Sequence, residues 1–257
     1  MNQFRPSSFQ VLPTVIKNLV IINVLVFLAQ YTMKASGILD MEDLFGLHHV
    51  KSPLFQPWQL ITHLFLHSTE GWGHIVFNML TLWMFGAVLE NIWGPKKFIT
   101  FYFICGLGAA LLHLTFLWFE YQDMLNQFVL IKQSATPGNV SLFFQQFHLD
   151  RFRGGTEVVN NYVSDPENPT AHSQAVGFIN QFIYLKLSVA TIGASGAIAG
   201  VMAAFMYMFP NTEIYLYFLL PVKAKWLGII YFGQELYFAI TKAEGDNVAH
   251  WAHLGGA

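Results

Sequence analysis

The feature that most constrains this chain is a series of long apolar runs that contain very few charged residues. A helix needs about 20 apolar residues to cross the hydrocarbon core of a bilayer, which is about 30 Å thick. Charged residues make up 11% of the chain, whereas soluble domains contain about 25%. The sequence therefore predicts an all-α, polytopic membrane helix bundle in a lipid bilayer. Its six expected spans are Thr14–Met33, His74–Leu89, Phe98–Phe119, Gly193–Phe209, Trp226–Ile240 and Val248–Ala257.

The last run and one connection depart from a regular six-span plan. Val248–Ala257 is too short to cross about 30 Å of hydrocarbon, so we expect this last span to be truncated. Residues 120–186 form a polar insert of about 65 residues between spans three and four, with no run long enough to span a bilayer. We interpret residues 1–257 as a single membrane domain that carries this insert on the extracytoplasmic side.

The positions of the lysines indicate the orientation. The short loops after spans two and four carry Lys96, Lys97, Lys223 and Lys225, which by the positive-inside rule places them and the N-terminus in the cytoplasm. Spans two, four and six then begin at the outer face. The compact six-span plan suggests a bacterial inner (plasma) membrane. The net charge of −2 provides no basic field, so nucleic acid is not expected as a partner.

A serine stands between glycines where the fourth span begins, in the stretch Gly193-Ala194-Ser195-Gly196. A serine hydroxyl becomes a useful nucleophile when a base removes its proton. The start of a helix also presents free N–H groups that can stabilise an oxyanion. The same cluster of small residues is typical of close helix packing, so the motif by itself leaves both interpretations open.

A candidate base lies in the last span. His253 is ionisable at membrane depth, where such residues are costly and usually functional. Gly255 and Gly256 follow it, and small residues let two helices approach closely. His250 lies three residues earlier on nearly the same face, and we interpret it as a polar neighbour of the base.

The second span carries His74 and Asn78, whose spacing places them on one helical face. Two such side chains can donate hydrogen bonds toward one oxyanion, although hydrogen bonding between helices would also explain them. Glu235 in span five is interpreted as an interfacial glutamate that is protonated or snorkels to the membrane surface. No acidic partner for the base is evident in the sequence, so a Ser-His dyad is expected.

Taken together, these residues resemble the rhomboid family of intramembrane serine proteases. The resemblance covers the chain from about Trp58 onward, apart from the insert, and includes Thr62–His67, His74–Asn78, Glu90–Phe98, Gly193–Gly196 and Ala252–Gly256. It implies that Ser195 is the nucleophile, that His253 is the base and that His74 and Asn78 form the oxyanion site. It also implies substrates that are transmembrane proteins, cleaved near the outer face without a cofactor or metal. Many members carry an aromatic residue four positions after the serine to stack on the histidine, whereas this chain has Ala199.

Two other functions stay open at this point. A non-catalytic rhomboid-like protein would bind membrane clients, but loss of the serine or histidine usually marks such proteins. A histidine-box metal-dependent oxidase is suggested by His63 and His67, together with His74, His250 and His253. Zinc proteolysis of the HExxH type is excluded at the first pair, because Leu64 occupies the place of the glutamate.

Overall fold

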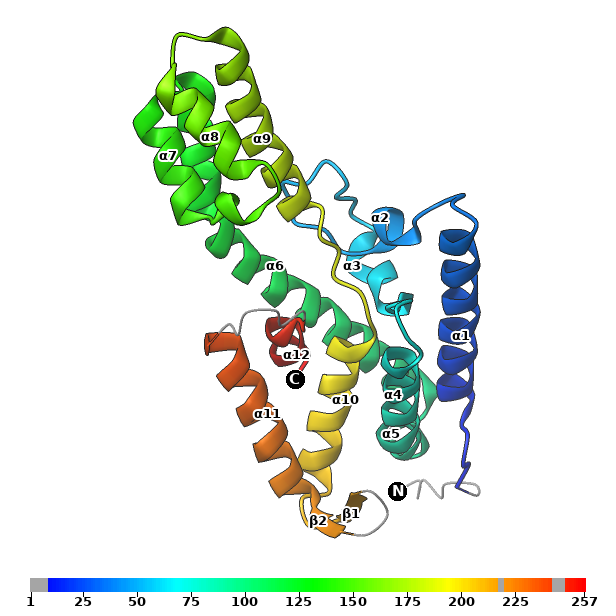
Figure 1. The fold of residues 1–257 in the computed structure, drawn as a ribbon. Coiled ribbons are helices and arrows are strands. Elements are labelled where there is room, and N and C mark those ends of the chain that lie inside the picture. Colours follow the sequence, from blue (N-terminus) through cyan, green and yellow to red (C-terminus); the bar gives the residue numbers. More distant parts are fainter. Residues whose placement is uncertain (1–8, 217–219, 242–247) are drawn as a thin grey trace. The chain divides into compact units, whose positions relative to one another are not determined.

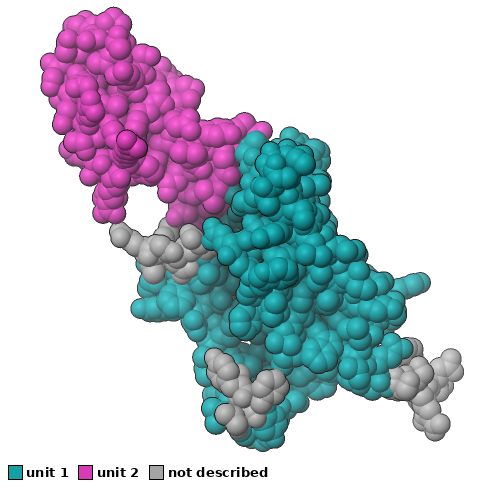
Figure 2. Space-filling model, turned by 45° about the vertical axis from the view of Figure 1, so that its right-hand side comes forward, with its two compact units in different colours: residues 1–47, 54–114, 190–257 teal, residues 48–53, 115–189 magenta. Residues whose placement is uncertain are grey.

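The computed structural model describes residues 9–216, 220–241 and 248–257, and most of them are helical (Figure 1). The chain divides into two compact units (Figure 2). The first comprises residues 1–47, 54–114 and 190–257, and the second comprises residues 48–53 and 115–189. The sequence predicted one membrane domain with an insert at residues 120–186, and the second unit covers this range together with residues 48–53, 115–119 and 187–189.

The first unit contains most of the apolar helices. Its elements are α1 (Thr14–Ala35), α2 (Met41–Phe45), α3 (Gln59–Thr62), the short 3₁₀ turn η1 (His63–Phe65), α4 (Gly73–Thr81), the π-helical turn η2 (Leu82–Gly86), α5 (Ala87–Trp93), the first part of α6 (Pro95–Gln133), α10 (Ser195–Met208), α11 (Ala224–Thr241) and α12 (His250–Gly256). Among the described residues, three helical segments are long and apolar enough to cross a membrane: Thr14–Ala35, Gly73–Trp93 and Pro95–Gln133. The predicted polytopic helical membrane bundle is confirmed.

Two helix ends in the first unit are set by a Gly-Pro pair and by a carboxylate from another helix. A helix stop follows the second span: α5 ends at Trp93, Gly94 adopts a φ of 79°, and α6 begins at Pro95. The start of α1 has no side-chain cap of its own. Glu90 of α5 supplies one, because its two carboxylate oxygens accept hydrogen bonds from the backbone N–H groups of Val15 (2.8 Å) and Ile16 (2.9 Å). A buried carboxylate thereby ties α5 to the N-terminus of α1.

Two short extended pairings depart from the expected all-α structure. Strands β1 (Glu213–Leu216) and β2 (Leu220–Lys223) pair antiparallel between α10 and α11, with Glu213 opposite Lys223. Leu47 and Thr191 exchange two backbone hydrogen bonds of 2.9 and 2.8 Å. This bridge attaches the segment that precedes α10 to the long first loop, and so helps to position the start of α10.

The second unit folds around an apolar core of its own. It contains the last part of α6, α7 (Pro137–Gln146), the 3₁₀ turn η3 (Leu149–Arg151), α8 (Gly155–Ser164) and α9 (Pro169–Leu187). Its fully buried side chains include Val140 and Phe143 of α7 and Ile179 of α9. Residues 120–186, expected as a polar insert, are thus largely helical in the structure.

The third span is also longer than the sequence predicted. The hydrophobic run ends near Phe119, but α6 continues to Gln133. At 1.5 Å per residue its 39 residues extend about 58 Å, roughly twice the hydrocarbon thickness. The residues after Phe119 therefore continue the helix, and the apolar ones among them, including Met124 and Ile131, pack in the core of the second unit.

Candidate active site

Ser195 is the first residue of α10, where the chain turns from an extended segment into the helix. The turn depends on Gly193, whose φ of 124° is unfavourable for residues with a side chain. The backbone N–H of Gly193 donates to the carbonyl of His63 at 2.9 Å, which ties this turn to the first loop. Because α10 begins at Ser195, its first N–H groups have no partners within the helix.

His253 lies on α12, which packs against both α10 and α11 (Figure 1). Its Nε2 atom is 2.9 Å from Ser195 Oγ, at hydrogen-bond distance, although 58 positions separate the two residues. His253 as a whole is 9% exposed. The sequence-predicted serine and histidine are therefore brought together in a buried site.

Glycines on both helices make this contact sterically feasible. A Cβ atom added at Gly256 would overlap the carbonyl oxygen of Gly196, and one at Gly200 would overlap the carbonyl oxygen of Gly256. At Gly255 an added Cβ would lie 2.8 Å from the carbonyl oxygen of Gly108 on α6. The glycines of the two predicted motifs thus let α12 pack with its backbone against α10 and α6.

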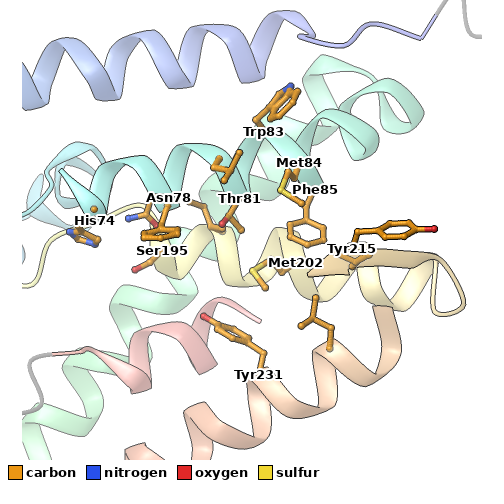
Figure 3. A pocket seen from close by; sticks show the side chains of 16 residues that line it. His74, Asn78, Thr81, Trp83, Met84, Phe85, Ser195, Met202, Tyr215 and Tyr231 are labelled. Atoms are coloured by element: carbon orange, nitrogen blue, oxygen red, sulfur yellow. The ribbon is translucent and has the colours of Figure 1, made fainter. Parts of the chain in front are cut away.

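His74 and Asn78 of α4 lie beside the serine. Figure 3 shows both side chains with Ser195 at one end of a cavity. The backbone N–H of Ser68 donates to His74 Nδ1 at 3.1 Å. A neutral His74 must then carry its proton on Nε2, which makes that atom a hydrogen-bond donor. The Nε2 atom would be 3.1 Å from a Cβ placed on Gly193, so the donor faces the turn that precedes the serine.

The cavity next to Ser195 has a volume of about 1000 Å³ and a largely apolar lining. It extends from His74 and Asn78 along the π-helical turn η2 to Tyr215 on β1 and Tyr231 on α11 (Figure 3). Single π-helical turns inside α-helices are frequent at functional sites. The arrangement places a serine hydroxyl at the end of a space that can hold apolar side chains.

Glu235 is placed differently from the sequence interpretation. Its side chain is not an interfacial, snorkelling group, because the residue is 7% exposed and turns toward α12. Its Oε2 atom accepts a hydrogen bond of 2.6 Å from His250 Nδ1 and lies 2.9 Å from His253 Nδ1. Ala199, in contrast, is fully buried and offers no ring to the histidine. Glu235 could be singled out in the sequence because it is an ionisable residue at membrane depth. The sequence did not show which residues it contacts.

Among the residues that the structure describes, no three of the five histidines considered for a metal-dependent oxidase lie close enough together to bind one metal ion. His63 Nδ1 bonds to the carbonyl of Gln59 at 2.7 Å, and the rings of His67 and His74 are 5.1 Å apart. Burial lowers the pKa of His63 to about 4; burial, with a smaller contribution from His74, lowers that of His67 to about 4 as well.

A metal ion could be held by a different set of side chains. Within the described part of the chain, the one cluster of histidine and acidic side chains with suitable spacing is Glu235, His250 and His253, whose ligand atoms lie within 4.8 Å of one another. It includes His253, which also contacts Ser195, and it leaves out His63, His67 and His74.

Comparison with known proteins identifies the family. The rhomboid domain model matches residues 54–124 and 169–257, more than half of the chain. The chain is a member of the rhomboid family. The interruption in the match lies within the second unit, so the family model does not match residues 125–168, between the third and fourth expected spans.

Two curated relatives match most of this rhomboid. RHOMBOID-like protein 12, mitochondrial, of Arabidopsis thaliana is 27% identical over 198 residues, which cover 77% of this chain and 43% of that protein. An uncharacterized mitochondrial rhomboid protein of Schizosaccharomyces pombe is 24% identical over 221 residues, covering 82% of this chain and 52% of the relative. The chain therefore spans about half the length of these relatives. No solved structure matches it significantly.

A shorter match concerns a protein named as a protease. The rhomboid protease GluP of Bacillus subtilis is 32% identical over 59 residues, 23% of this chain and 11% of that protein. The family and the apolar helices establish that this rhomboid is an integral membrane protein. The expected bacterial inner membrane is not supported, because the two relatives with the longest matches are named as mitochondrial.

Proposed function

We propose that this rhomboid is a serine-type intramembrane endopeptidase that cleaves transmembrane segments of other membrane proteins near the outer face. The observation that carries the proposal is the 2.9 Å contact between Ser195 Oγ and His253 Nε2 at the N-terminus of α10. A nucleophile within hydrogen-bond distance of a base is the arrangement that covalent hydrolysis requires. The match to a relative named as a rhomboid protease adds support.

In the proposed reaction, Ser195 Oγ attacks the carbonyl carbon of a peptide bond while its proton moves to His253 Nε2. The oxyanion is stabilised by the first N–H groups of α10, by His74 Nε2–H and by the Asn78 amide. His253 then returns the proton to the leaving amine nitrogen as the C–N bond breaks, which leaves an acyl group on Ser195. Water deprotonated by His253 hydrolyses this ester and restores the serine.

The cavity fits a substrate segment with apolar side chains. It begins at Ser195 and is lined mainly by apolar residues of α4, η2, α10 and α11. A peptide bond inside a helix is hydrogen-bonded and shielded by neighbouring side chains, so the segment must unwind locally before the serine reaches it. We therefore expect cleavage near the end of a transmembrane helix, at a sequence that leaves the helical conformation easily.

The test combines a fluorophosphonate probe with a single-span model substrate in detergent micelles or liposomes. The natural chain is expected to be labelled and to cleave the substrate at one site identified by mass spectrometry. Ser195→Ala and His253→Ala are expected to lose both activities while they retain the thermal unfolding transition of the natural chain. A folded natural chain that shows neither labelling nor cleavage would contradict the proposal and favour the client-binding alternative.

A further inference from the structure

The carboxylate of Glu235 joins two histidines of the neighbouring helix α12. His250 Nδ1 donates an aligned hydrogen bond to Oε2 at 2.6 Å, and His253 Nδ1 lies 2.9 Å from the same oxygen. The contact with His253 has the distance of an ion pair but not the alignment of a hydrogen bond. One buried oxygen therefore faces both imidazoles.

This arrangement determines which nitrogen of His253 can accept a proton. A carboxylate beside Nδ1 favours the tautomer that carries its hydrogen there, and this leaves Nε2 as the acceptor. Nε2 is the atom that faces Ser195 Oγ at 2.9 Å. When the imidazole takes up the serine proton it becomes a cation, and the attraction to Glu235 strengthens because both groups are buried.

We propose that Glu235 is the positioning carboxylate of a Ser195–His253–Glu235 triad, and that His250 holds this carboxylate in place. The inference rests on the proposed proteolytic function and replaces the expected dyad. A carboxylate in this position holds the imidazole in the correct tautomer and orientation and stabilises the imidazolium without becoming protonated itself. Glu235 does not touch the substrate, so its effect is on the chemical step and not on substrate affinity.

The test compares Glu235→Gln with the natural chain in a detergent-based cleavage assay that contains a chelator. An amide can donate to Nδ1 and so favours the wrong tautomer of His253, as in the aspartate-to-asparagine variant of the serine protease triad. We expect kcat to fall about 10²- to 10⁴-fold with KM unchanged, and the rate of fluorophosphonate labelling to fall in parallel. Glu235→Asp is expected to recover part of kcat. His250→Asn is expected to lower kcat about tenfold, because Glu235 loses its aligned donor.

Glu90→Gln is the matched control, because it makes the same chemical change in another buried carboxylate, the one that caps α1. It should lower the thermal midpoint and leave kcat per folded molecule unchanged. A Glu235→Gln variant with kcat within threefold of an active natural chain would overturn the triad while the proposed protease stands. A natural chain without activity or labelling would instead remove the proposed function. Activity that is lost with the chelator and restored by Zn²⁺ would assign Glu235, His250 and His253 to a cation, and would also overturn the triad.

Discussion

Replacement of Gly256 by alanine tests whether the glycine contact between α12 and α10 is what brings His253 to the serine. An added Cβ at this position would overlap the carbonyl oxygen of Gly196, a backbone atom that no side-chain rotation can move away. The overlap is deeper than at Gly255, where the nearest carbonyl oxygen would be 2.8 Å away and ordinary contact begins at 3.4 Å. The two helices must therefore separate by about 1 Å, a displacement of the size that costs roughly 100-fold in rate.

The consequence for the site follows from the distance between the reacting groups. Ser195 Oγ and His253 Nε2 are 2.9 Å apart, and His253 lies one turn before Gly256 on the same short helix. A shift of about 1 Å takes this distance beyond 3.5 Å, outside hydrogen-bond range. We expect Gly256→Ala to lower kcat/KM for a transmembrane substrate and the rate of fluorophosphonate labelling by about 10²-fold or more. Overpacking is also expected to lower stability by about 1–3 kcal/mol.

The assay is cleavage of a single-span substrate in detergent, with rates corrected for the folded fraction measured by thermal unfolding. Gly233→Ala on α11 is the matched control, because a Cβ there meets nothing within 4 Å. It should retain both rates and the thermal midpoint. If Gly256→Ala kept kcat/KM within threefold of the natural chain, close backbone packing would not be what positions the base.

Three further predictions concern stability. Glu90→Ala removes the two acceptors that cap α1 and should lower the free energy of unfolding by about 2–3 kcal/mol, measured by denaturant titration in mixed micelles; an unchanged midpoint would contradict this. Burial lowers the pKa of His63 and His67 to about 4, below the value of 6.5 for an exposed histidine. Between pH 4 and pH 6.5 the unfolded chain therefore binds more protons than the folded chain. The thermal midpoint should therefore fall as the pH decreases from 7 to 5, and equal midpoints would refute the reasoning. Phe143→Ala leaves a cavity in the core of the second unit and should cost about 3–5 kcal/mol. Limited proteolysis should then cut residues 120–186 faster than in the natural chain, whereas an unchanged rate would mean that this core does not hold the unit together.

The sequence by itself determined the helices that are apolar along their whole length. Thr14–Ala35 and Gly73–Trp93 were expected within a few residues, because the length of an apolar run and the Gly94-Pro95 stop are local properties of the chain. The placement of His74 and Asn78 on one helical face was predictable for the same reason, because it depends only on their spacing along the chain. The predicted end of the third span at Phe119 was not the end of the helix, because α6 continues to Gln133. The residues that bury this part of α6 lie in α7, α8 and α9, and an apolar run in the sequence does not indicate them.

Only the tertiary structure decided which ionisable groups meet. Ser195 and His253 are 58 positions apart, and Glu235 and His250 are 15 apart on different helices. Their contacts depend on how α10, α11 and α12 cross, which in turn depends on backbone approaches at Gly196, Gly200 and Gly256. A sequence motif indicates that small residues allow helices to come close. It does not specify the rotation of each helix about its axis, and that rotation turns the Glu235 carboxylate toward the imidazoles of α12 instead of toward the membrane surface.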